Sequence, residues 1–102
     1  MSAHDDLNVL REAFREVSTA MLMLKLCEEI GEAAQAYVGA TGSNPRKGFY
    51  SCGREVAGEL ADVAITSLVA MGAFVPDPIE FLAARLEYAA ERMQRAAEEA
   101  HA

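Results

Sequence analysis

Two long apolar helical runs, each interrupted by a pair of acidic residues, constrain what this chain can fold into. The runs cover residues 20–38 and 52–75. Their acids, spaced three apart, are Glu29 with Glu32 and Glu59 with Asp62. Residues three apart on a helix lie on neighbouring lines of one face. Each helix therefore presents two carboxylates on one stripe, and a loop that made the helices antiparallel would let the two stripes converge.

Weaker patterns predict two further helices. Apolar side chains recur at spacings of three and four over residues 7–17, which indicates a first helix. Asp77 followed by proline is typical of a helix start, and predicts a last helix over residues 78 to about 98. Residues 39–48 are rich in Gly, Ser, Asn and Pro, which predicts a loop between the two long runs. Ser51 is the expected N-cap of the second long run.

These patterns predict an all-α fold of four helices in a single domain over residues 1–102. We expect a four-helix bundle-like protomer. A chain this short buries only a modest core, and no charge occurs over residues 63–76, so we expect assembly into an oligomer. The apolar side of the last helix is expected to consist of Leu82, Leu86, Ala89 and Met93.

Charge and composition argue against several classes of protein. The formal net charge of −7 disfavours a nucleic-acid partner, because such binding depends on clustered Lys and Arg. The two cysteines, Cys27 and Cys52, form no CxxC pair, and both histidines lie near the chain ends, so no zinc site is expected. We recognise no signal peptide and no apolar run of about 20 residues, which predicts a cytoplasmic protein without a membrane partner.

The acidic pairs have two interpretations from the residues alone. Acids on a helix usually face solvent, but Lys or Arg partners are then interleaved with them, and none lies between Glu28 and Glu32. Their flanks are apolar, and carboxylates that face a packed interior are unfavourable unless compensated. Metal coordination compensates them. All-oxygen ligation favours Mg²⁺ or Mn²⁺, whereas a bundle di-iron site would need internal histidines.

Two neighbouring features also have more than one explanation. Gly31 lowers helix propensity by up to about 1 kcal/mol relative to Ala. It serves either close helix packing or access of a ligand to the backbone. Arg46 and Lys47 are the only adjacent basic pair in the chain. They either contact phosphate groups or belong to an ordinary solvated loop.

The order of the acidic motifs resembles one enzyme family. An EExxE motif that begins at Glu28, followed by an ExxD motif that begins at Glu59, is similar to the signature of the MazG-like nucleoside triphosphate pyrophosphohydrolases. Lys25 before the acids and Gly31 within them also resemble the family's KLxEExGE form. The resemblance extends over about residues 20–75.

The resemblance implies a single all-α MazG-like domain, Mg²⁺ with Mn²⁺ as a substitute, and dimers or tetramers whose site lies where subunits meet. It implies hydrolysis of a nucleoside or deoxynucleoside triphosphate to the monophosphate and pyrophosphate, as in house-cleaning of nucleotide pools. The implied metal ligands are Glu29, Glu32, Glu59 and Asp62. The implied catalytic residues are Glu28, Glu29 and Glu32, with Glu28 either a further ligand or the base that orients water. The implied substrate-binding residues are Lys25, Arg46, Lys47 and Arg85.

One position departs from the family pattern, because Ala89 stands where an asparagine is expected. A second hypothesis is therefore a non-catalytic or weakly active helical module that assembles and binds metal or nucleotide through the same acids. A third is a plain helical bundle with solvated acids. Only the enzyme hypothesis predicts pyrophosphate release that fails in Glu32→Gln or Asp62→Asn.

Overall fold

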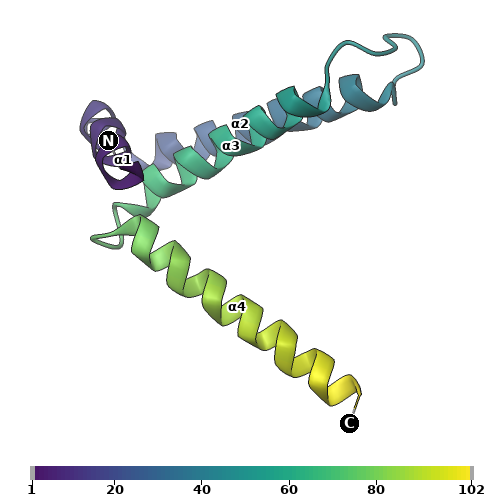
Figure 1. Cartoon of the computed structure of the whole chain (residues 1–102). Helices are drawn as coiled ribbons and strands as arrows, with labels where there is room; N and C mark the ends of the chain where they lie inside the picture. The colour runs from purple at the N-terminus through teal and green to yellow at the C-terminus, as the bar shows by residue number, and fades with distance from the viewer. Residues whose placement is uncertain (1, 102) are drawn as a thin grey trace.

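The computed structural model describes residues 2–101, and these form four α-helices. The helices are α1 (Ala3–Ala13), α2 (Thr19–Thr41), α3 (Gly53–Met71) and α4 (Pro78–Ala100). The all-α prediction is confirmed for this part of the chain, in which no strand is present (Figure 1). None of the described helices is long and apolar enough to cross a membrane.

Side-chain caps set the starts of three helices. In α1, the Ser2 hydroxyl accepts a hydrogen bond from the Asp5 amide, and the Asp5 carboxylate accepts one from the Ser2 amide, both at 3.1 Å. This reciprocal cap starts α1 at Ala3, before the predicted position. Ser18 caps α2, and Asp77 caps α4 as predicted; each accepts a bond of 3.1 Å from the amide three residues on.

The ends of α3 differ from the prediction. Its N-cap is Cys52, which makes no side-chain cap bond. The Ser51 hydroxyl, expected to cap the helix, instead donates to the Glu55 carboxylate at 2.8 Å. At the other end α3 stops at Met71 rather than at residue 75, because the chain turns tightly from Gly72 onward.

α2 and α3 lie side by side and form a long antiparallel hairpin (Figure 1). The residues buried along the two helices are Leu22, Glu29, Ala33, Gly39, Thr66, Val69 and Ala70. At the loop end, the Tyr50 amide donates to the Gly39 carbonyl at 3.0 Å. A Cβ on Gly39 would lie 2.6 Å from the Tyr50 ring, so the loop folds back onto α2 only because this position has no side chain.

The hydrophobic core lies at the opposite end of the hairpin, where α1 crosses it. Its buried members are Leu7, Leu22, Val69 and Ala70. Partly buried residues pack around them: Leu10, Phe14, Leu68 and Ile79. The core therefore joins α1, α2, α3 and only the first turn of α4.

Beyond that turn, α4 leaves the hairpin and runs away from it (Figure 1). Its predicted inner side is exposed: Leu82 retains 47%, Leu86 68% and Met93 72% of their accessible surface. A single chain is thus not a closed four-helix bundle, although a bundle-like protomer was expected. The predicted apolar side of α4 is therefore not covered by any other part of residues 2–101.

The open shape leaves an unusual amount of surface in contact with water. The accessible surface is 7602 Å², whereas a folded monomer of 11.0 kDa should expose about 5,600 Å². The radius of gyration is 17.4 Å, against about 13 Å for a compact domain of this length. One protomer therefore exposes roughly 2,000 Å² more than a compact monomer would.

Candidate functional site

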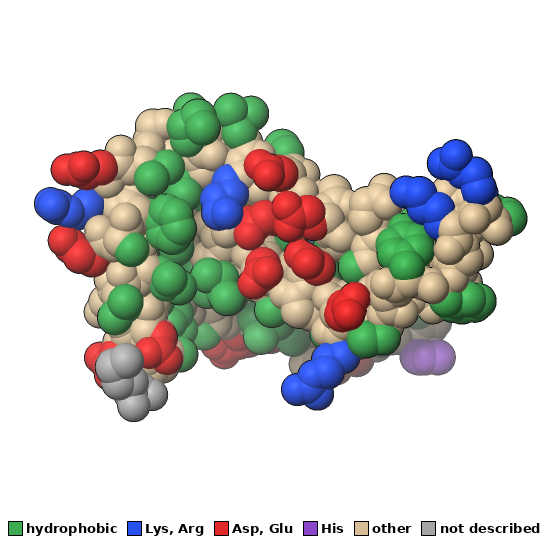
Figure 2. Space-filling view, turned by 90° about the horizontal axis from the view of Figure 1, so that it is seen from above, with side chains coloured by type: hydrophobic (Ala, Val, Ile, Leu, Met, Phe, Trp, Pro, Cys, Tyr) green, Lys and Arg blue, Asp and Glu red, His purple; other side chains and the backbone are tan. Residues whose placement is uncertain are grey.

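An acidic cleft opens between α2 and α3, near the loop that joins them. It encloses about 470 Å³ and is lined by Glu32, Gln35, Ala36, Tyr50, Ser51, Glu55, Gly58, Glu59 and Asp62. Figure 2 shows acidic side chains gathered over the middle of this face, while basic side chains gather at its loop end. Four of the nine lining residues are acidic and none is basic. The cleft is therefore a site of strong negative potential.

Glu29 lies at the buried seam beside this cleft. It retains only 8% of its accessible surface. Its Oε1 is buried without a hydrogen-bond partner, and its Oε2 lies 4.0 Å from the Lys25 ammonium. Leaving a buried polar atom unpaired typically costs about 1–3 kcal/mol, and more for a charged group. Glu29 is thus a carboxylate that folding has desolvated without satisfying both of its oxygens.

Glu59 on α3 is a second carboxylate in an environment that disfavours its charge. Its pKa is raised above the usual value, first by partial burial and then by the neighbouring carboxylates of Glu32, Asp62 and Glu29. All four predicted metal ligands therefore lie near enough to influence one another, although two come from each helix. Their mutual repulsion would be relieved by a cation or by protonation.

The chemistry of these donors fits a hard divalent cation. Carboxylate oxygens suit Mg²⁺ and Mn²⁺, and Glu29 supplies an oxygen that has no other partner. As the side chains are placed, however, no three His, Cys, Asp or Glu residues within residues 2–101 form a ready coordination group. Two of the four predicted ligands, Glu32 and Asp62, are exposed to solvent.

Sequence reasoning missed Glu55 and Gln35 as cleft residues, and it left Tyr50 open between stacking on a base and packing in the loop. Glu55 continues the row of Glu59 and Asp62 one turn earlier, and this spacing of four and three was visible in the sequence. The Tyr50 hydroxyl lies 3.1 Å from the Gln35 backbone carbonyl and 3.2 Å from its side-chain Oε1. That contact depends on the turn of the loop, which no sequence signal specified.

The structure decides one open question about the glycines. A Cβ on Gly31 would meet nothing within 4 Å, so this residue is not required for close helix packing. The closely packed glycine within α2 is Gly39 instead, against Tyr50 and Ser51. Gly58, which lines the cleft, is as open as Gly31.

The predicted phosphate contacts are only partly brought together. Lys25 lies beside Glu29. The Lys47 ammonium lies 6.0 Å from the ring centroid of Tyr50, which places it next to the cleft rim. Arg46 is exposed in the loop, where its amide donates to the Asn44 side chain at 3.1 Å.

Of the predicted site residues, Glu32, Glu59 and Asp62 line the cleft itself, whereas Glu28 and Arg85 lie outside it. Glu28 is exposed on α2, beside Glu29 in sequence. Arg85 is on α4, where its guanidinium lies 5.6 Å from the ring centroid of Tyr88. Because α4 runs away from the hairpin, Arg85 does not join the acidic cleft within one chain (Figure 1).

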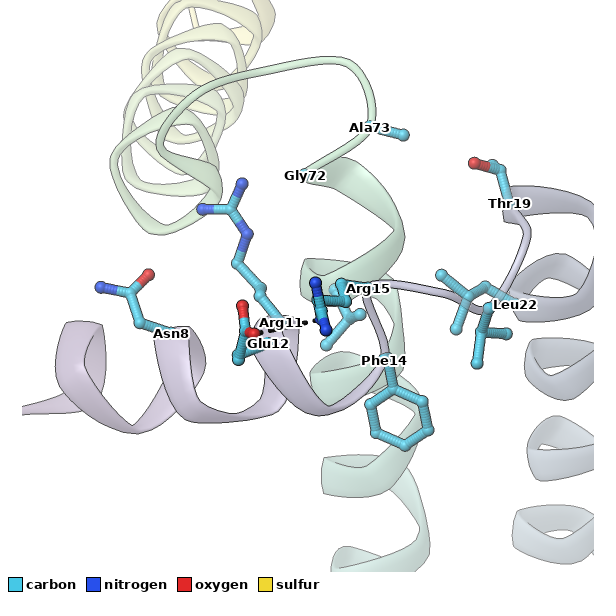
Figure 3. A pocket seen from close by; sticks show the side chains of 11 residues that line it. Asn8, Arg11, Glu12, Phe14, Arg15, Thr19, Leu22, Gly72 and Ala73 are labelled. Atoms are coloured by element: carbon cyan, nitrogen blue, oxygen red, sulfur yellow. Dashed lines mark ion pairs between the residues drawn. The ribbon is translucent and has the colours of Figure 1, made fainter.

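A second pocket, of about 530 Å³, lies where α1 meets the ends of α2 and α3. Its arginines already have partners. Arg15 pairs with Glu12 at 3.1 Å, and Arg11 donates to the Pro76 carbonyl at 3.3 Å. Figure 3 shows the ion pair of Arg15 with Glu12, and Phe14 and Leu22 are among the apolar residues that line the same pocket. The Arg11 bond links α1 to the turn before α4, whereas the Arg15 pair is local to the end of α1, and the acidic cleft is left as the candidate site.

The cleft has the chemistry of a cation site that could in turn receive an anion. Its lining contains no Lys or Arg, so phosphate groups would be repelled unless cations bound first. The phenol of Tyr50 and the amide of Gln35 provide the neutral polar groups of its wall. Comparison of the chain with models of known protein families, with curated proteins and with solved structures found no match.

Proposed function

We propose that this protein is a Mg²⁺-dependent pyrophosphohydrolase of nucleoside or deoxynucleoside triphosphates, with Mn²⁺ as a substitute ion. The observation that carries the proposal is the partnerless, buried Oε1 of Glu29 beside three further carboxylates. The order and spacing of these acids also resemble the MazG-like signature. Removal of unwanted nucleotides from the cellular pool is the role that this activity would serve.

In this proposal Glu29, Glu32, Glu59 and Asp62 hold the metal. When bound, Mg²⁺ supplies positive charge that neutralises phosphate oxygens and makes water more acidic. One water is consumed: its oxygen joins the α-phosphorus, the bond from that phosphorus to the bridging oxygen breaks, and pyrophosphate leaves. The proton of the water passes to a carboxylate and then to solvent.

The remaining roles follow from where the side chains lie. Glu28, exposed beside Glu29, is proposed to orient the attacking water or to serve as a further ligand. Lys25 and Lys47 are near enough to the acids and the cleft rim to contact outer phosphate oxygens. Arg46, exposed next to Lys47 in the same loop, is proposed to contact phosphate as well.

We also propose a homodimer or homotetramer as the working state, without a nucleic-acid partner. The roughly 2,000 Å² of surplus surface supports this, since it exceeds the about 800 Å² per partner of a standard interface. A cleft open along one side of a two-helix hairpin would be more enclosed if a second chain covered it.

The alternative is a non-catalytic or weakly active module that binds metal or nucleotide. The observation that favours it is Ala89, which stands where the resembling family has an asparagine. Both hypotheses predict that Mg²⁺ raises the melting temperature, because a ligand that binds only the folded state stabilises it. Turnover separates them.

The test is to incubate the purified protein with a panel of nucleoside and deoxynucleoside triphosphates and Mg²⁺. Release of pyrophosphate and monophosphate in equal amounts, abolished by EDTA, is the expected result. Glu32→Gln and Asp62→Asn should each lower the rate by roughly 100-fold or more, as for other groups that stabilise developing charge.

The matched control is Glu91→Gln, which makes the same substitution on α4, away from the cleft. Its rate should equal that of the unsubstituted protein. Absence of release from every triphosphate, with Mg²⁺ still raising the melting temperature, would replace the enzyme proposal by the binding module. Equal rates in all three variants would show that the acidic cleft is not the site.

A further inference from the structure

The exposed face of α4 has the periodicity of a helix that pairs with another helix. Apolar residues recur along it at alternating spacings of four and three. They are Leu82, Leu86, Ala89, Met93, Ala96 and Ala100, and all six are exposed. We call this row the α4 seam. Single exposed apolar residues are common on protein surfaces, but a continuous row over the length of a 23-residue helix indicates a covered face.

The flanks of the α4 seam differ from each other. On one side, every flanking position is alanine: Ala83, Ala90 and Ala97. On the other side the equivalent positions are Arg85, Arg92 and Glu99. The alanine side permits close approach of a second helix. The charged side carries opposite signs at its two ends, which is the pattern that fixes the direction of a partner.

We propose that α4 pairs with α4 of a second copy of this chain, in antiparallel orientation. In that orientation each large seam residue faces a small one. Leu82 lies against the partner's Ala100, Leu86 against the partner's Ala96, and Met93 against the partner's Ala89. A parallel pair would instead place leucine against leucine and alanine against alanine, and would leave the layers unevenly filled.

The charges select the same orientation. In an antiparallel pair with this register, Arg85 faces the partner's Glu99, and the two-fold axis repeats the contact. Arg92 falls near the axis, opposite the partner's Arg92. The Arg92 guanidinium lies 5.7 Å from the ring centroid of Tyr88 on its own helix, outside the α4 seam. This position reduces the repulsion between the two Arg92 side chains. A parallel pair would set Arg85 beside alanine and gain no ion pair.

The amount of surface agrees with this partner. A single protomer exposes roughly 2,000 Å² more than a compact monomer, and α4 is exposed along its whole length beyond the first turn. An antiparallel helix pair would cover part of that surplus. The inference concerns assembly alone and does not depend on the proposed reaction.

The first experiment measures the mass of the full chain in solution by light scattering after gel filtration. The unsubstituted protein should be a dimer or a tetramer. Leu86→Glu, in the α4 seam, should halve the mass of the assembly. Ala84→Glu adds the same charge on the opposite face of α4 and should leave the mass unchanged. A monomeric unsubstituted protein, or an assembly unaffected by Leu86→Glu, would overturn the proposal.

A second experiment tests orientation without altering the apolar seam. Arg85→Glu and Glu99→Arg should each weaken the assembly by about tenfold in dissociation constant, because each creates like-charge contacts. The double variant should restore the original constant. Single variants that weaken the assembly without recovery in the double variant would exclude the antiparallel register, and helix content measured by circular dichroism would confirm that each variant is folded.

Discussion

The α2–α3 hairpin and α4 show the same helical periodicity but differ in what covers it. In the hairpin, the apolar rows of two consecutive helices face each other, and a loop short enough to hold them antiparallel brings the partner from the same chain. In α4 the row is equally regular, yet it faces solvent. A periodic pattern therefore indicates that a face is covered, without indicating which element or which chain covers it.

The two regions also differ in where they place charge. Glu29 sits in the buried row of the hairpin, where a carboxylate is unfavourable without a partner. In α4 the row is wholly apolar, and the charged residues flank it. The charge inside the hairpin row underlies the proposed metal site, and the charges beside the α4 row underlie the proposed pairing. This contrast leads us to assign ligand chemistry to the hairpin and assembly to α4.

The largest expected effect is a loss of stability when a leucine is shortened in the buried core of the hairpin rather than on the exposed face of α4. Leu22→Ala removes a buried core side chain and should lower the free energy of unfolding by about 2–5 kcal/mol. Leu86→Ala makes the same change on the exposed α4 seam. It should have a smaller effect, which depends on protein concentration because it acts through assembly. Chemical denaturation at two protein concentrations provides the measurement, and equal, concentration-independent losses would contradict the comparison.

The next effect concerns the loop end of the hairpin. Gly39→Ala should destabilise the fold by about 1–3 kcal/mol, because the new methyl group displaces the Tyr50 ring and weakens its bond to Gln35. Gly31→Ala is the control on the same helix, where a Cβ meets nothing.

Gly31→Ala should stabilise the helix by up to about 1 kcal/mol. Thermal unfolding measures both glycine variants, and pyrophosphate release then tells whether Gly31 admits a ligand. A stabilised variant with full activity would rule out that role for Gly31, while a destabilised one would contradict its open surroundings.

A smaller effect tests whether α4 is held by its own cap. Asp77→Ala removes the acceptor for the Glu80 amide and should reduce stability by about 1 kcal/mol. Asp77→Asn retains an acceptor and should recover most of the loss. Amide hydrogen exchange along α4 would show where the effect falls. Faster exchange confined to the hairpin would contradict a local cap.

The smallest effect is a pH dependence in the hairpin. The pKa of Glu59 is raised in the folded state above its usual value of 4.5. Folding thus favours the protonated carboxyl of Glu59. The contribution of this group to the free energy of unfolding is fully present below pH 4.5, and it is lost as the pH rises through the higher folded pKa. Glu59→Gln should therefore raise the melting temperature more at pH 7 than at pH 4, in the absence of divalent cations.

With Mg²⁺ at pH 7, the unsubstituted protein should instead have the higher melting temperature. The ion stabilises its clustered carboxylates, and Glu59→Gln has lost one of them. Glu91→Gln provides the control on α4 and should show neither effect. A melting temperature for Glu59→Gln that tracks the unsubstituted protein at both pH values would show that the carboxylates do not repel one another.

Much of the local structure could be predicted because it depends on neighbours in the sequence. The caps of α4 and the extent of α2 follow from residues within one turn of each other. The proximity of Glu59 to Glu29, Glu32 and Asp62 could be predicted from the spacing of the acids and from a loop that lets α2 and α3 run antiparallel. The start of α1 was misplaced because the reciprocal Ser2–Asp5 cap competes successfully with the apolar pattern that begins at Leu7.

The sequence by itself determined the helices, the two acidic pairs and the apolar row of α4, since each depends on the 3.6-residue repeat and on local hydrogen bonds. Only the tertiary structure decided that Glu29 is desolvated with one oxygen unpaired, that Gly39 rather than Gly31 is the packed glycine of α2, and that α4 departs from the hairpin. Those outcomes depend on which surfaces meet in space. Burial and close approach are properties of pairs of elements, and a single helical pattern does not encode its partner.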